Sequence, residues 1–197
     1  MAEADLSESF LPEAELRWAN LAGAVLESAN LNNTSMVRAN LQEAKLTNAK
    51  LRGANLSWAN LRGANLSGVD LTQALLQEVN LVNANLRDAN LSGADLTNAN
   101  LNGADMRGSN IGRDYLQNVV VTMSGADLSG ADLSGADLSG ADLSGVNFKS
   151  ANLRDVNLRK ADIKNATFEE ANLKGATMPD GKIHVEMNTK EDELLEF

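Results

Sequence analysis

Hydrophobic residues recur at every fifth position along almost the whole chain. The series begins at Leu6 and runs to Leu116, and after a slip of two residues it continues from Met123 to Met178. All 35 positions are apolar and most are Leu. The residue two places earlier is Ala in 26 of the 35 pentads, and the residue between them is Asn or Asp in 24. Self-similarity of this kind predicts a repeat architecture.

A five-residue period fits neither an α-helix nor a continuous β-strand. Five residues turn about 500° on a helix, so successive Leu side chains would point all round it. On a strand, an odd period would send successive Leu side chains to opposite faces. A composite unit removes the conflict. Three extended residues point Ala and Leu to one side and Asn to the other, and the next two residues form a turn.

Four pentads close a square coil of about 20 residues if each turn bends the chain by about 90°. Stacked coils would hydrogen-bond like a parallel sheet, about 4.8 Å apart, which gives about nine coils and a rod of roughly 42 Å. Leu would fill a narrow axis, and Asn or Asp would face outward and bond the local backbone. The candidate core residues are Leu66, Leu86, Leu91, Leu96, Phe148 and Phe168.

The repeats resemble those of the pentapeptide-repeat proteins. Ala39-Asn-Leu41, Ala59-Asn-Leu61-Arg-Gly63 and the run from Ala126-Asp-Leu-Ser-Gly130 through Gly145 match the A(D/N)LXX pattern of that family, and the match covers about residues 4–178. The resemblance implies an all-β fold, a right-handed quadrilateral parallel β-helix. The close of the repeats, Gly175 to His184, is similar to that of cyanobacterial members. Some members of the family are DNA mimics that bind type II topoisomerases, and a cyanobacterial member regulates cell differentiation through protein contacts.

The pattern divides the chain into three regions. We expect residues 1–15 to form an N-terminal cap or a degenerate first coil, and residues 16–178 to form the repeat β-helix. Residues 179–197 would form a turn at Pro179-Asp-Gly181, followed by an acidic cap. A short helix could begin near Thr189, either covering the last coil or making a dimer contact.

The slip in the pentad series predicts a two-residue insertion near residues 113–122. Interruptions of a regular scaffold often carry function. Tyr115 would take the outward position usually held by Asn, beside the extra residues Val119 and Val120. These three residues are a candidate partner contact; the alternative is a tolerated insertion at a corner.

Residues four pentads apart should stack in one column, and one such column is unusual. Trp18, Arg38 and Trp58 share an outward turn position, which would place a guanidinium between two indole faces. Exposed Trp residues are frequent anchors for partner proteins. The column is therefore a second candidate partner site; the alternative is a ladder that only stabilises the surface.

Composition narrows the classes of function. The 197 residues include 27 acidic and 17 basic side chains, one His and no Cys, with a net charge of −10. No disulfide or His cluster is possible, and a filled rod offers no concavity for catalysis, so we expect no enzyme, metal or cofactor. The charge argues against direct nucleic-acid binding. No apolar run is long enough for membrane insertion. The absence of a visible export segment favours the cytoplasm, with a processed lumenal form still open.

The charge is concentrated at the two ends. Residues 1–15 hold five acids and no base, residues 186–197 hold five acids and one Lys, and the chain between them carries a net charge of only −1. We therefore favour a non-catalytic scaffold or regulatory protein, a monomer or weak homodimer, that binds a protein partner through one side of the rod. The alternatives are a DNA-mimicking inhibitor or protector of DNA gyrase and a purely structural spacer.

Overall fold

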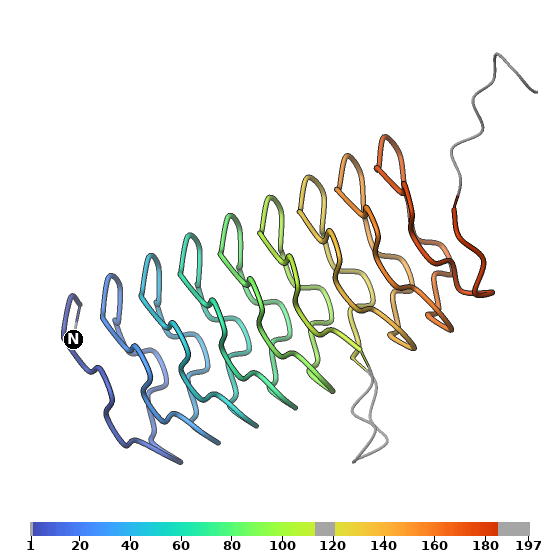
Figure 1. Cartoon of the computed structure of the whole chain (residues 1–197). Coiled ribbons are helices and arrows are strands. Elements are labelled where there is room, and N and C mark those ends of the chain that lie inside the picture. Colours follow the sequence, from blue (N-terminus) through green and yellow to red (C-terminus); the bar gives the residue numbers. More distant parts are fainter. Residues whose placement is uncertain (1, 113–120, 185–197) are drawn as a thin grey trace, which may run out of the picture.

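A computed structural model describes residues 2–112 and 121–184. The chain winds into similar coils stacked along one axis, so the molecule is a rod (Figure 1). The described residues contain no helix, and their β-structure consists of single bridged residues and not of continuous strands. No helix in this part of the chain is long and apolar enough to cross a membrane.

The outward residue of each pentad forms a parallel bridge with the outward residue one coil further on. The four columns of bridges begin at Asp5↔Val25, Phe10↔Asn30, Glu15↔Ser35 and Asn20↔Asn40. Each bridge consists of two backbone hydrogen bonds. The N–H of Leu6 donates to the carbonyl of Val25 (2.7 Å), and the N–H of Val25 donates to the carbonyl of Ala4 (2.9 Å). The repeat is therefore a four-sided parallel β-helix in which four pentads complete one coil.

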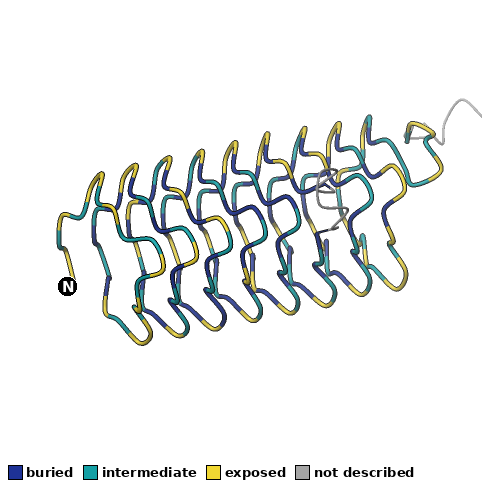
Figure 2. Cartoon of the chain, turned by 90° about the horizontal axis from the view of Figure 1, so that it is seen from below, coloured by how far each residue is buried: buried dark blue, intermediate teal, exposed yellow. Residues whose placement is uncertain are grey.

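A tight turn makes each corner of the coil. At the corner of Trp18, the N–H of Ala19 donates to the carbonyl of Leu16 (3.1 Å), and the second turn residue, Trp18, has φ of 60°. A positive φ at that position defines a type II turn, which usually places Gly or Asn there. Exposed residues gather at the corners, and buried residues line the inside of the coils (Figure 2).

The Ala and Leu side chains fill the axis of the rod. Leu66, Leu86, Leu91 and Leu96 are at most 1% exposed. Phe148 is completely buried and stacks on the partly buried Phe168, with 5.1 Å between ring centroids and 14° between ring planes. One large and one small inward residue per side thus fill the narrow interior.

The outward Asn and Asp side chains bond the local backbone, as predicted. The Asn30 Oδ1 atom accepts the N–H of Asn32 (3.2 Å), and the same contact recurs in many pentads. In several columns the amides also bond each other from coil to coil. Asn40 donates to Asn20 (3.3 Å), and Asn60 donates to Asn40 (3.3 Å). These contacts explain why a short polar amide occupies the outward position.

The prediction of a two-residue insertion is wrong. Asp95 pairs with Thr122, whereas the regular spacing of four pentads would pair it with Tyr115. The insertion between Gly112 and Val121 is therefore seven residues long, and Thr122 takes the position in the ladder predicted for Tyr115. The apolar pattern continues through Leu116, so the sequence alone gives no sign that Asp95 pairs with Thr122. Residues 113–120 lie outside the described part.

The two ends of the rod differ. Residues 2–20 already make the regular bridges, although Leu6, Leu11 and Leu16 are only partly buried. At the other end the chain reverses at Gly181, which has φ of 86°, and Ile183 forms an antiparallel bridge with Thr177. The proposed helix near Thr189 lies outside the described residues.

Candidate partner-binding surface

The structure brings Trp18, Arg38 and Trp58 together as one stack at a corner of the first three coils. The Arg38 guanidinium carbon lies 4.8 Å from the centroid of Trp18 and 5.5 Å from that of Trp58. The backbone fixes this spacing, because the N–H of Trp18 donates to Val37 and the N–H of Arg38 donates to Ser57 (both 3.0 Å). We call these three residues the Trp column.

The Trp column combines high exposure with an unfavourable backbone. Trp18 is 67% exposed and Trp58 48%. All three residues have φ of 59–60°, in the left-handed region. That conformation costs a residue with a side chain about 1–2 kcal/mol, whereas Gly adopts it freely. The two cation–π contacts contribute only about 0.5–1 kcal/mol each at an exposed site. The column therefore does not stabilise the fold beyond what Gly at the same corners would achieve.

A chain of hydrogen-bonded polar side chains lies beside the Trp column on one side of the rod. The Ser57 hydroxyl donates to the Gln77 side-chain oxygen (2.6 Å), and the Gln77 amide donates to Asp95 (2.6 Å). Leu75 occupies an outward position on the same side and is 40% exposed. Its replacement of the usual Asn was visible in the sequence, as the only Leu in any outward position. Trp18 and Trp58 thus place apolar surface on both sides of Arg38, and Leu75 adds an exposed apolar residue on the adjoining side of the rod.

The other candidate contact is the insertion near residues 113–122. Tyr115, Val119 and Val120 lie outside the described residues. Gly112 and Val121, which flank them, are both buried. The side of the rod that carries Leu75 has two corners. The Trp column lies at one of them, and Gly112 and Val121 lie at the other, as the bridge Asp95↔Thr122 shows.

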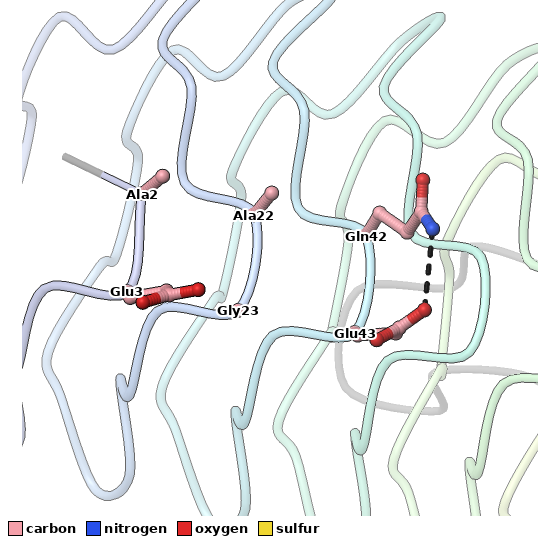
Figure 3. Close-up of a pocket in the computed structure, with 6 residues that line it drawn as sticks. All are labelled: Ala2, Glu3, Ala22, Gly23, Gln42 and Glu43. Carbon is pink, nitrogen blue, oxygen red and sulfur yellow. Dashed lines mark hydrogen bonds between the residues drawn. The ribbon is translucent and has the colours of Figure 1, made fainter.

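A small pocket lies at another corner of the first three coils. It has a volume of about 260 Å³ and is lined by Ala2, Glu3, Ala22, Gly23, Gln42 and Glu43. Gly23 leaves a gap between the two Glu side chains, and the Gln42 amide donates to Glu43 (3.2 Å) (Figure 3). The lining holds no His, Ser or Lys beside the carboxylates, so the pocket lacks a nucleophile paired with a base.

The acidic run at residues 127–142 does not converge. Asp127, Asp132, Asp137 and Asp142 belong to four different columns of bridges, and their Oδ1 atoms accept backbone N–H groups two residues on. Over residues 2–112 and 121–184, no group of three or more potential ligand side chains could hold a metal ion.

The surface ion pair between Arg107 and Asp105 shifts the pKa of the carboxyl group. The hydrogen bond from the Arg107 guanidinium lowers the pKa of Asp105, and the partial burial of that carboxyl opposes the shift. The Arg107 Nη2 to Asp105 Oδ2 distance is 2.5 Å. This pair lies in a coil beyond the Trp column and is a local surface contact.

The coil register and the outward amides are those of a family of known repeat proteins. The family model of pentapeptide repeats matches residues 1–36, 39–77, 74–112, 121–149 and 151–180 in eight copies. The chain therefore belongs to the pentapeptide-repeat family.

Several solved structures are similar. HetL from the cyanobacterium Nostoc, a pentapeptide repeat protein involved in heterocyst differentiation regulation, is 36% identical; the match covers 93% of this chain and 92% of HetL, with a TM-score of 0.60. QnrB1, a plasmid-mediated fluoroquinolone resistance protein, is 20% identical over 83% of this chain and 88% of its own, with a TM-score of 0.44. A protein of the Arabidopsis thaliana thylakoid lumen is 33% identical over 62% of this chain and 70% of its own, with a TM-score of 0.23. Functionally curated proteins give no significant match.

Proposed function

We propose that this protein is a non-catalytic regulatory scaffold that binds a protein partner through the Trp column and the adjoining side with Leu75. The observation that carries the proposal is the exposure of the two indoles beside Arg38. Trp18 is 67% exposed and Trp58 48%, whereas the other described corners with positive φ carry Gly or polar side chains. Large exposed Trp side chains beside an Arg are typical of surfaces that bind other proteins.

The chemistry of the Trp column suits a protein interface. Trp and Arg are the residues most enriched among interface hot spots, and an exposed apolar cluster beside satisfied polar groups is typical of such sites. HetL is involved in the regulation of differentiation, and its 36% identity over 93% of this chain supports a regulatory role here as well. The proposal includes a right-handed helix of about nine coils, a cytoplasmic location, and a monomer or weak homodimer.

The experiment is affinity capture from a native lysate with a matched set of baits. The Trp18→Gly/Trp58→Gly double variant removes both indoles and relieves the backbone, so it should fold like the wild type. Glu43→Gly makes the same kind of change, at φ of 58°, on another corner. We expect proteins retained by the wild type and by Glu43→Gly to be lost from the double variant. Equal retention by all three baits would refute this site.

The DNA-mimic alternative requires negative charge along the rod. Between residues 16 and 185 the net charge is −1, because Arg and Lys are interspersed with the acids. Each charge acts over only about 10 Å at moderate ionic strength, so the acidic ends do not make the middle resemble a duplex. A supercoiling assay tests the alternative directly: we expect excess protein to leave DNA gyrase unaffected. A structural spacer would give no specific partner in the capture experiment.

A further inference from the structure

We propose that the Trp column recognises a carboxylate on its partner, an Asp or Glu side chain flanked by apolar groups, with Arg38 as the residue that binds it. This inference rests on the proposed function and names the chemistry of the partner.

The stacking limits how a ligand can approach Arg38. The Arg38 guanidinium lies 4.8 Å from the Trp18 centroid and 5.5 Å from the Trp58 centroid, so both of its faces are covered. The indole faces that contact Arg38 are covered as well. A ligand that stacks on these faces, such as a sugar ring or a nucleobase, therefore has no room between the three groups. Arg38 is left with the edge of its guanidinium, and each indole keeps its edge and the face turned away from Arg38.

The exposed edges are hydrogen-bond donors without acceptors. A guanidinium carries five N–H donors and an indole carries one, and neither group has an acceptor. Among the described residues, none of the three side chains has a hydrogen bond or ion pair that would use these donors. By contrast, Arg17 in the neighbouring turn position pairs with Glu15 (3.1 Å). The Trp column thus offers a set of fixed donors, which an acceptor-only anionic group satisfies best.

The surroundings favour a single carboxylate over a dense cluster of negative charge. The Arg17–Glu15 pair is neutral overall, and Glu78 is the next residue of the same corner after Trp58. Within the described coils, Arg38 is therefore an unpaired cation between Trp18 and Trp58. The first coil carries the five acids of residues 1–15, which would repel a dense anionic partner more strongly than a single carboxylate. A planar carboxylate can accept two parallel bonds from the edge of a guanidinium, and apolar neighbours would pack on the indole edges and Leu75.

The column also provides its own readout. Trp18 and Trp58 are the only Trp residues of the chain, so the intrinsic Trp fluorescence of the protein reports on this site alone. The probe is a random peptide library displayed on phage, selected on the wild-type protein and depleted on Arg38→Gln. We expect the selected peptides to share an Asp or Glu next to apolar residues.

Titration of a selected synthetic peptide, followed by Trp fluorescence, then tests the role of Arg38. We expect Arg38→Gln to weaken binding at least tenfold. Arg38→Lys should also lose several-fold, because an ammonium group cannot form two parallel bonds or stack as a plane. Arg52→Gln, which removes an exposed Arg of a neighbouring corner, should change the dissociation constant less than twofold. Circular dichroism should show the same fold for all variants.

Three results would overturn the inference. The selected peptides could lack carboxylates, acidic peptides could bind Arg38→Gln as tightly as the wild type, or inorganic phosphate could displace the peptide better than acetate at equal ionic strength. The last result would make the column a phosphate site. If the Trp double variant loses its captured partners while Arg38→Gln keeps them, the proposed function stands and the carboxylate assignment fails.

Discussion

The first three coils and the segment from residue 125 to residue 145 meet the same backbone requirement in opposite ways. Every corner needs a second turn residue with positive φ. Between residues 2 and 58, ten of these residues have side chains and only Gly23 and Gly53 are glycines. Between residues 125 and 145, all five are glycines.

The difference separates what the fold needs from what the surface displays. The glycine segment forms the same bridges as the first coils, such as Asp127↔Asn147, so side chains at the corners are unnecessary for the coil. At corners without Gly the backbone is strained, but a functional side chain is displayed on the surface. The Trp column displays the bulkiest of these side chains. Corners with Gly avoid the backbone strain and display no side chain at that position.

One continuous core lies beneath both regions, and Leu91 lies between them with no exposed surface. Leu91→Lys should abolish folding, because an unpaired buried charge costs more than the stability of a typical domain can absorb. Asn90→Lys, at the outward position beside it, should be nearly neutral. Urea denaturation followed by circular dichroism measures both. Similar damage from the two changes would contradict the alternation of inward and outward residues.

The second prediction concerns the space at two glycine corners. A Cβ atom at Gly68 would overlap the Asn48 Oδ1 atom, whereas a Cβ at Gly130 would meet nothing within 4 Å. We expect Gly130→Ala to lower the free energy of unfolding by about 1 kcal/mol because of its positive φ, and Gly68→Ala to lower it further, because the Asn48 amide must also move aside.

A second substitution checks the cause of that difference. Asn48→Ser shortens the side chain that lies across Gly68 and should restore most of the additional loss in the double variant. Equal losses for Gly68→Ala and Gly130→Ala would show that the corners of the two regions are equally open.

The third prediction tests the strain at the Trp column. Trp58→Gly loses a cation–π contact and relieves the positive φ, so its free energy of unfolding should stay within about 0.5 kcal/mol of the wild type. Trp58→Ala loses the contact and keeps the strain, so it should be about 1 kcal/mol less stable. Chemical denaturation distinguishes the two, and an Ala variant as stable as the Gly variant would remove the argument from strain.

The smallest effect belongs to Asp105, in a coil between the two regions. Its pKa is lowered in the folded protein by the hydrogen bond from Arg107. A lowered pKa stabilises the folded state above the unfolded value of about 3.9, and this stabilisation is lost as the pH falls through the folded pKa. Asp105→Asn should therefore be slightly less stable than the wild type at neutral pH, with the gap closing in acid. Because the pair is on the surface, added salt should also narrow the gap in the urea denaturation midpoint.

Much of the architecture could be predicted from the period of five alone. It predicted the inward Leu and Ala, the outward Asn and the four-pentad spacing that stacks Arg38 between Trp18 and Trp58. The number of inserted residues could not be predicted, because the apolar pattern continues through Leu116 and does not mark where the ladder resumes, at Thr122. A hydrophobic period reports only which residues could face inward.

Two features of the corners could not be predicted from the sequence either. Placing Trp58 in a turn did not show that its φ would be positive, because the sign depends on the turn type. The contact between Asn48 and Gly68 depends on how a side chain lies across the next coil, which spacing alone does not describe. Both features arise from backbone geometry at the corners.

The pairing of Asp95 with Thr122 across the insertion has a practical consequence for protein engineering. The ladder resumes in register after the insertion, and the columns on both sides of that corner keep their pairing. The chain can thus change length there without moving the coils before or after. The corner between Gly112 and Val121 is accordingly a natural grafting point, where a foreign peptide could be displayed on the rod.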